Sequence, residues 1–306
     1  MAIDLQFSDG GARSNVSTEE DAAHRLEGSS NFRVLRRLAP PILRPEAMTE
    51  IGHGRRLAVL LDTETTGVDH AHDVAIELSM LAVTYDEVGL HDVVGVFEGL
   101  EDPGRPLSPD VLRLTGLTDA ELRDRRIDRE ALEKFLTPVS LVIAHNARFD
   151  RTFAERLHPT FSMLPWACSL EEIPWAEAGA GSRKLEDLLR RLGLFHDGHR
   201  ALTDCHALLR ILNSAVGEGR PAAFVELLRT ARRTTIEIRA LDAPYNARHA
   251  LKARRYRWLK GNDGKFAWTI LVDERDQEGE LAFLRPLLPP NAEPPVRRLT
   301  AFNRHK

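Results

Sequence analysis

The stretch that decides the fold is LAVLLDTETTG, residues 57–67. Its apolar run has the length of a strand and leads into Asp62 and Glu64, before Gly67 ends the strand pattern. Residues two apart in a strand point to the same face, so both carboxylates should project together from the strand end. Two such carboxylates repel each other unless a cation lies between them, and hard cations such as magnesium prefer oxygen ligands. Taken alone, the motif is also compatible with two solvated acids.

The composition predicts a globular protein with room for one large domain and a smaller one. The 306 residues are 42% hydrophobic and 29% charged, with a formal net charge of −4, so any nucleic-acid-binding face must be local. Cys168 and Cys205 are expected to be buried apolar residues in a reducing compartment. Without a signal-peptide pattern or a run of 18 apolar residues, we expect a cytoplasmic protein with no membrane partner.

Residues 1–54 form an N-terminal extension in this interpretation. Residues 1 to about 16 are polar and are expected to be disordered. The spacing then predicts a short helix from Ser17 through Leu26 and a second one over Phe32–Leu38, which ends before Pro40-Pro41.

Residues 55–216 alternate between strand and helix patterns, which indicates an α/β domain. Short connections between its first three strands favour antiparallel pairing. The expected strands are 57–61, 75–85, 93–97, 141–144 and 165–169. Helices are expected to begin at 108, 118 and 129, to follow the cap residue Asn146 through Leu157, and to cover 182–192 and 201–216.

Residues 217–306 form a small α+β accessory region after the turn-rich segment 217–221. Ten lysines and arginines between residues 229 and 260 are opposed only by Glu237 and Asp242, and aromatic residues are interleaved with them. The segments 255–259 and 266–272 predict a hairpin. Its aromatic residues either form a small core or stack bases beside a bound polyphosphate backbone; their strand spacing favours the core.

Further along the chain, Asp150, His199 and Asp204 join the first two acids. Asp150 lies one turn into the helix after strand 141–144, and His199 precedes the helix whose first turn carries Asp204. Four carboxylates and a histidine at the ends of different elements suit phosphodiester hydrolysis. Two divalent ions about 3.5–4 Å apart can stabilise the attacking and leaving oxygens, and an imidazole can take a proton from water.

Other polar residues near these motifs are interpreted without a chemical role. His70, His72 and His196 are expected to be solvated loop residues, and Glu77 is expected to be structural within its strand. Taken alone, Asp150 is also compatible with an exposed acid on a helix, and His199 with a loop histidine that has no chemical role.

Residues 61–67 (LDTETTG), 145–150 (HNARFD) and 199–204 (HRALTD) resemble the three motifs of the DEDDh (DnaQ-like) 3′-5′ exonucleases. This family includes the proofreading epsilon subunit of bacterial DNA polymerase III. The resemblance covers about residues 55–215. It implies an α/β, ribonuclease H-like fold with a mixed five-stranded sheet flanked by helices.

The resemblance also implies the roles of the five residues. Asp62, Glu64 and Asp204 would hold one Mg²⁺ or Mn²⁺ ion, and Asp62 would be shared with a second. Asp150 would act on the metals mainly through water, and His199 would be the general base.

The same resemblance implies contacts to the substrate. The backbone around Thr65, Thr66 and Gly67 would lie near the terminal nucleotide. Asp110 and Thr115 belong to a segment that would pack beside the terminal base. The epsilon subunit has a histidine at the position of Thr115, which is a departure of this chain from the family pattern.

The implied activity is release of nucleoside 5′-monophosphates from 3′ ends of single-stranded or frayed DNA. Action on RNA ends is one alternative, and a non-catalytic, polymerase-associated nucleic-acid-binding module is another. The intact set of five residues argues against the second. Residues 284–288 lack the glutamine of a sliding-clamp motif, so the sequence does not imply stable association with a polymerase. Association with replication or repair proteins is left open.

Overall fold

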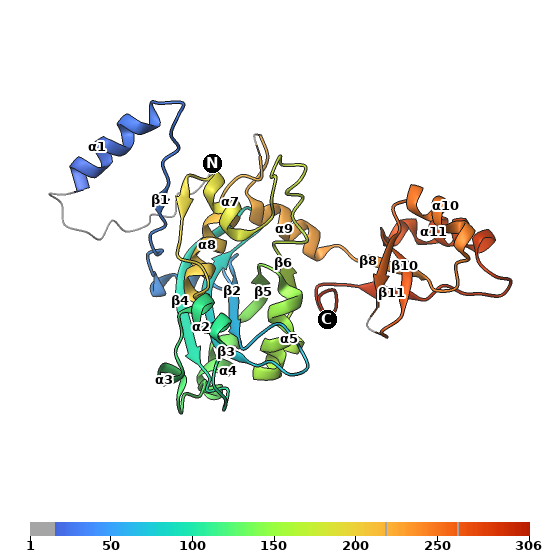
Figure 1. The fold of residues 1–306 in the computed structure, drawn as a ribbon, viewed down its shortest axis with the longest axis horizontal. Coiled ribbons are helices and arrows are strands. Elements are labelled where there is room, and N and C mark those ends of the chain that lie inside the picture. Colours follow the sequence, from blue (N-terminus) through green and yellow to red (C-terminus); the bar gives the residue numbers. More distant parts are fainter. Residues whose placement is uncertain (1–15, 218, 262) are drawn as a thin grey trace. The chain divides into compact units, whose positions relative to one another are not determined.

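The structure is a computed structural model that describes residues 16–217, 219–261 and 263–306 (Figure 1). The expected disorder of the N-terminus falls on residues 1–15, outside the described ranges. The chain forms two compact units that divide between Ala231 and Arg232, and the last two residues, His305 and Lys306, belong to the first unit.

This division lies later than the turn-rich segment 217–221 suggested. The helix α9 (Ala223–Arg232) follows that segment, and its apolar residues Phe224 and Leu227 are fully buried in the core of the first unit. Burying each such side chain contributes roughly 1.5–3 kcal/mol, so the helix is held to the first unit by packing.

The first unit is built around a mixed five-stranded sheet of order β4-β3-β2-β5-β6. β2 pairs antiparallel with β3, β3 pairs antiparallel with β4, and β5 runs parallel to both β2 and β6. The predicted α/β architecture and antiparallel pairing are therefore confirmed. The strands are β2 (Arg56–Thr65), β3 (Ala75–Tyr85), β4 (Leu90–Leu100), β5 (Val139–Ala144) and β6 (Trp166–Cys168).

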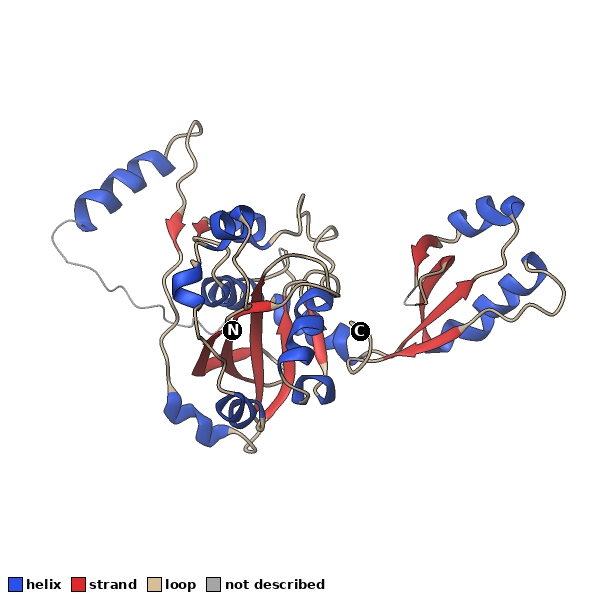
Figure 2. Ribbon diagram, turned by 60° about the horizontal axis from the view of Figure 1, so that its bottom comes forward, coloured by secondary structure: helices blue, strands red, loops and turns tan. Residues whose placement is uncertain are grey.

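Helices cover both faces of this sheet (Figure 2), which explains why its central strands are continuous apolar runs. Along β2, Ala58 and Leu60 belong to the core beneath α8 (Ala201–Leu212). Val59 and Leu61 belong to the opposite core, together with residues of α5 (Ala147–Leu157). Cys168 and Cys205 are buried and free, as expected.

Two of the shorter helices of the first unit begin at side-chain caps that the sequence predicted. Ser108 caps α2 by accepting from the backbone N–H of Val111, and Thr118 forms a capping box with Glu121. Asn146 occupies the cap position of α5, but its side chain makes no capping bond. Besides α5, α8 and α9, the helices described in the first unit are α1 (Val16–Glu27), α2 (Pro109–Thr115), α3 (Asp119–Leu122), α4 (Arg129–Leu136), α6 (Thr160–Met163), α7 (Leu185–Arg191) and the 3-10 helix η1 (Pro45–Glu50).

The helix predicted over Phe32–Leu38 is wrong. The segment instead contains β1 (Arg36–Arg37), which pairs in parallel with β7 (Leu194–Phe195). The backbone N–H of Leu38 donates to the carbonyl of Phe195 at 2.8 Å, while Phe32 is exposed. A helix this short is marginal by itself, so pairing with a distant strand decides the local structure.

The second unit is a four-stranded antiparallel sheet of order β11-β8-β10-β9, with α10 and α11 on the same side of it (Figures 1 and 2). The predicted α+β appendage and its β9–β10 hairpin are confirmed. Its elements are β8 (Thr235–Ala240), η2 (Tyr245–Ala247), α10 (Arg248–Ala253), β9 (Arg257–Lys260), β10 (Phe266–Asp273), η3 (Glu274–Asp276), α11 (Gln277–Leu284), η4 (Arg285–Leu287) and β11 (Val296–Leu299).

The aromatic residues of the hairpin differ in burial. Trp268 is half-buried and packs against the core of Ile236, Ile238 and Leu251, as the strand spacing predicted. Trp258 and Phe266 are 52% and 53% exposed, so the prediction that they form the core is wrong for these two. None of the helices in the described ranges has the length and apolar character needed to cross a bilayer.

Candidate active site

Three carboxylates meet where β2 passes under the start of α8. Asp62 and Glu64 share one face of β2, and Asp204 lies in the first turn of α8. Ligand oxygens of the three residues all lie within 4.8 Å of one another. The structure therefore brings together three predicted metal ligands that are separated by 140 residues of sequence, because α8 packs directly on β2 and β3.

Asp150 reaches the same region from α5 and is buried. Its Oδ1 atom accepts hydrogen bonds from the backbone N–H of Thr63 at 3.1 Å and from the Thr63 hydroxyl at 2.9 Å. Burial raises the pKa of Asp150 to about 7, against the lowering effect of these two bonds. Thr63 therefore holds the fourth carboxylate in place, a role that the motif did not predict.

The charges of the cluster are poorly compensated. Burial and repulsion from Asp150 and Asp204 raise the pKa of Asp62 well above its usual value. Burial and repulsion from Asp204 and Glu77 raise the pKa of Glu64 to about 8. Converging carboxylate oxygens that repel one another fit a hard divalent cation, because such a cation takes oxygen ligands and relieves the repulsion.

Two histidines contact Asp204, one through its backbone and one through its ring. The backbone N–H of His199 donates to Oδ2 of Asp204 at 2.9 Å, and the residue adopts a left-handed conformation with φ 64°. The His199 side chain is exposed, and its ring makes no hydrogen bond to any residue in the described ranges.

His196 is not the solvated loop residue that we expected. Its Nε2 atom lies 2.7 Å from Oδ1 of Asp204, and its side chain is only 6% exposed. It directly follows β7, so pairing of that strand with β1 places the residue beside α8. No motif spacing distinguishes His196, and the contact depends on this tertiary pairing.

Glu77 lies opposite Glu64 in the β2–β3 register and is buried. Its carboxylate accepts from the backbone N–H of Ala201 and from the guanidinium of Arg200, both at 3.3 Å. Because a helix N-terminus has unpaired N–H groups, this carboxylate anchors the start of α8. Glu77 therefore connects β3 to the helix that carries Asp204, in line with its interpretation as structural.

The loop after β2 is held by its own polar residues. The Thr65 hydroxyl donates to the carbonyl of Gly67 at 2.6 Å, and the Thr66 hydroxyl donates to Asp73 at 2.8 Å. A Cβ atom at Gly67 would lie 2.4 Å from Oδ2 of Asp73, so a larger residue here would displace this carboxylate. Arg105 also donates to Thr66 and Asp73. These bonds fix the backbone at 65–67, the predicted contact to the terminal nucleotide.

The other two predicted substrate contacts differ in accessibility. Asp110 is exposed and pairs with Arg113 at 2.7 Å. Thr115 is buried; its hydroxyl donates to the carbonyl of Val111 and accepts from the N–H of Leu117. This hydroxyl is occupied within its own segment, which argues against a direct contact between Thr115 and substrate.

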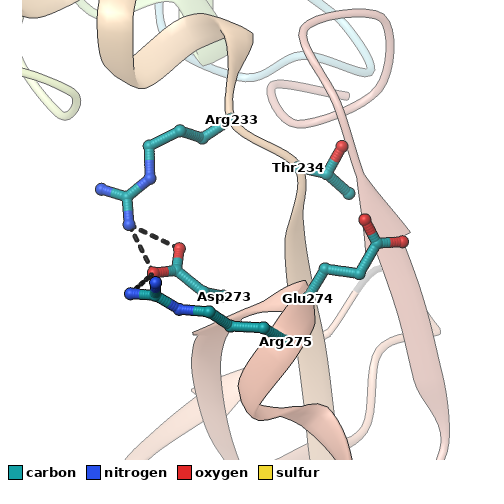
Figure 3. Close-up of a pocket in the computed structure, with 5 residues that line it drawn as sticks. All are labelled: Arg233, Thr234, Asp273, Glu274 and Arg275. Carbon is teal, nitrogen blue, oxygen red and sulfur yellow. Dashed lines mark hydrogen bonds and ion pairs between the residues drawn. The ribbon is translucent and has the colours of Figure 1, made fainter.

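Two surface pockets differ in their relation to the acidic cluster. One of about 500 Å³ lies beside it and is lined in part by Glu77, Phe97 and Arg200. The other, of about 610 Å³, lies in the second unit and is lined by charged residues that pair with one another, such as Arg233 with Asp273 (Figure 3). Neither pocket is lined by a carboxylate of the cluster itself.

A family profile described as Exonuclease matches residues 59–212, which span β2 through α8 and include all five predicted catalytic residues. The chain belongs to this exonuclease family. It is 29% identical over 173 residues to DNA polymerase III PolC-type of Bacillus subtilis and 36% identical over 172 residues to that of Bacillus cereus. Each match covers 53% of the chain and 12% of the relative, so the chain spans about an eighth of the length of these curated relatives.

The fold agrees with this family membership. The structure of Escherichia coli exonuclease I in complex with a dT13 oligonucleotide matches 71% of this chain and 63% of its own, with 16% identity and a TM-score of 0.50. This likeness confirms the predicted ribonuclease H-like exonuclease fold. The assignment of the chain to the DnaQ-like exonucleases, which we made from three short sequence motifs, is therefore confirmed.

Proposed function

We propose that the chain is a divalent-metal-dependent 3′-5′ exonuclease that releases nucleoside 5′-monophosphates from single-stranded or frayed DNA ends. The convergence of Asp62, Glu64 and Asp204 within 4.8 Å, in a member of the exonuclease family, carries this proposal. The PolC-type relatives are named as DNA polymerases, and exonuclease I was solved with a DNA oligonucleotide. Both facts favour DNA as the substrate.

The four carboxylates are proposed to hold two Mg²⁺ or Mn²⁺ ions, which would stabilise the attacking and leaving oxygens during phosphodiester cleavage. Asp62, Glu64 and Asp204 would bind one ion directly, since their oxygens already converge. Asp150 would serve the second ion mainly through water, and Thr63 fixes its orientation.

His199 is proposed to take a proton from the attacking water. An imidazole suits this step because its ordinary pKa lies near physiological pH. The hydrogen bond from its backbone to Asp204 places His199 at the edge of the acidic cluster. Its exposed ring makes no hydrogen bond to the described residues, so the ring can turn toward a bound strand end without losing one.

A strand-shortening assay tests the proposal. DNA labelled at its 5′ end should yield a ladder of shortened labelled products in Mg²⁺ and none in EDTA. The double variant Asp62→Asn/Asp204→Asn, purified in parallel, should be inactive. Intact substrate across Mg²⁺ and Mn²⁺ concentrations would refute the activity, and equal degradation by the double variant would reveal a contaminant.

A substrate panel at fixed salt resolves the finer alternatives. Single-stranded DNA, duplex DNA, a duplex with a 3′ mismatch and single-stranded RNA should be compared at equal length. We expect single-stranded and mismatched DNA ends to be degraded fastest. Faster degradation of RNA would instead identify an exoribonuclease. A cytoplasmic location and a part in replication or repair stay predictions.

A further inference from the structure

The β9–β10 hairpin of the second unit presents exposed aromatic rings at the edge of its sheet. Trp258 and Phe266 stack with a centroid distance of 6.2 Å and an interplanar angle of 15°. Trp258 also packs edge-to-face with Trp268 at a centroid distance of 5.5 Å, which connects the exposed pair to the core. The rings are therefore supported from beneath while their outer surfaces face solvent.

Two lysines lie beside these rings. Lys260 pairs with Phe266 across the hairpin, so the two side chains share a face, and Trp258, two residues before Lys260 on the same strand, points to that face as well. From α10, the Nζ atom of Lys252 lies 5.8 Å from the ring centroid of Trp268. Both lysines are exposed. We call Lys252, Trp258, Lys260 and Phe266 the hairpin surface.

The positive charge of the hairpin surface is not neutralised locally. In residues 219–261 and 263–306, no carboxylate lies within ion-pair distance of Lys252 or Lys260. Neighbouring cations are paired instead: Arg254 with Glu280 at 2.9 Å and Arg239 with Asp263 at 3.0 Å. Residues 232–304 contain 15 lysines and arginines against nine aspartates and glutamates, so the unit is basic although the whole chain has a net charge of −4.

We propose that the hairpin surface binds single-stranded DNA, with bases stacked on Trp258 and Phe266 and phosphates beside Lys252 and Lys260. Exposed rings flanked by unpaired cations are the combination that single strands require, because every base has a stacking face and every linkage a negative charge. A double helix hides its base faces and cannot use the rings. The choice of DNA over RNA rests on the proposed function.

This role adds a binding site that is separate in sequence and composition from the acidic cluster. The cluster would act on the last linkage of a strand, whereas the hairpin surface recognises stacked bases and backbone without regard to an end. Affinity should therefore increase with strand length and should not require a free 3′ hydroxyl.

Fluorescence anisotropy with the full-length protein in EDTA measures binding without turnover. The probes are labelled oligothymidylate strands of about 4 and about 20 nucleotides, since single-strand sites commonly cover about 4–16 nucleotides. Trp258→Ala and Phe266→Ala should each weaken binding of the longer strand about fivefold or more, the usual loss for one stacked base. Trp258→Phe should restore most of the affinity, because it keeps a stacking face.

A charge variant gives an independent readout. Lys252→Gln/Lys260→Gln should lower the slope of log affinity against log salt by about 0.7 for each lost phosphate contact. Two exposed residues of the same unit serve as matched controls. Leu271→Ala changes an apolar side chain on the opposite face of β10, and Arg285→Gln removes a cation from η4. Both controls should bind like the unmodified protein.

The results separate this inference from the proposed function. Unchanged affinity and salt slope in the hairpin variants would overturn the inference even if the chain degrades DNA. Weaker binding in those variants would support it even if no degradation occurs. The assignment to single-stranded DNA would be overturned if RNA of equal length bound more tightly than single-stranded DNA, or if duplex DNA bound equally tightly. Melting temperatures within about 2 °C of the parent protein would show that the variants fold.

Discussion

His196 and Asp204 form a close pair in which Nε2 of the imidazole lies 2.7 Å from Oδ1 of the carboxylate, in surroundings that exclude most solvent. The other oxygen of Asp204 accepts from the backbone N–H of His199. Both oxygens are thus held by neighbours, and the orientation of the carboxylate is set before any cation binds. Because such supporting contacts orient metal ligands, His196 is a positioning residue for the acidic cluster.

Replacing His196 should weaken binding of the metal itself. We expect His196→Ala to raise the dissociation constant for Mn²⁺ about 10–100-fold, the usual effect of removing a partner that orients a ligand. His196→Gln, which keeps a donor, should lose less. Mn²⁺ titration by calorimetry or electron paramagnetic resonance measures this directly, with the exposed His72→Ala as control. Equal Mn²⁺ affinity in His196→Ala and the parent protein would show that His196 does not position Asp204.

Removing a clustered charge should stabilise the metal-free protein while abolishing turnover. Asp62→Asn keeps the shape of the side chain but deletes a half-buried charge that Asp150 and Asp204 repel. We expect a higher melting temperature than that of the parent protein in EDTA at pH 8 and no detectable strand shortening in Mg²⁺. Asp69→Asn, on an exposed loop, is the matched control. A melting temperature equal to or below that of the parent protein would contradict the repulsion argument.

The metal-free protein should become less stable as pH rises from about 5 to about 8. The folded-state pKa values of Glu64 and Asp150 are raised to about 8 and about 7, so the folded state keeps protons that the unfolded state has released. Each group then lowers the free energy of unfolding by up to about 1.4 kcal/mol per pH unit within this window.

Urea unfolding in EDTA across this pH range measures the slope. Glu64→Gln should flatten it, because glutamine does not titrate, and excess Mg²⁺ should stabilise the protein most at the alkaline end. A free energy of unfolding that rises from pH 5 to pH 8 would be incompatible with the raised pKa values.

His199→Ala should reduce turnover about 10²–10⁴-fold, the range typical of a lost general base. DNA binding should be largely retained, since the ring makes no described contact in the absence of substrate. Single-turnover rates and anisotropy on the same DNA strand separate the two effects, with His53→Ala as an exposed control. A parallel loss of affinity would mean that His199 positions the substrate instead of moving a proton.

Local patterns were sufficient for much of the first unit. The largely apolar strand pattern of β3 predicted its bounds of 75–85, and caps at Ser108 and Thr118 predicted the starts of two helices. The two-residue period of a strand also places Asp62 and Glu64 on one face without any knowledge of tertiary structure. These features depend on residues only a few positions apart, so the sequence carries them directly.

Long-range packing decided the remainder. A parallel pairing with β7 converts Phe32–Leu38 from the expected helix into the segment containing β1, and packing of α9 moves the division between units beyond residue 217. The sequence alone thus determined the strand that carries two acids and the motifs that supply the others. Only the tertiary structure placed His196 on Asp204 and left Trp258 exposed at a sheet edge, because side-chain burial depends on which distant elements pack together.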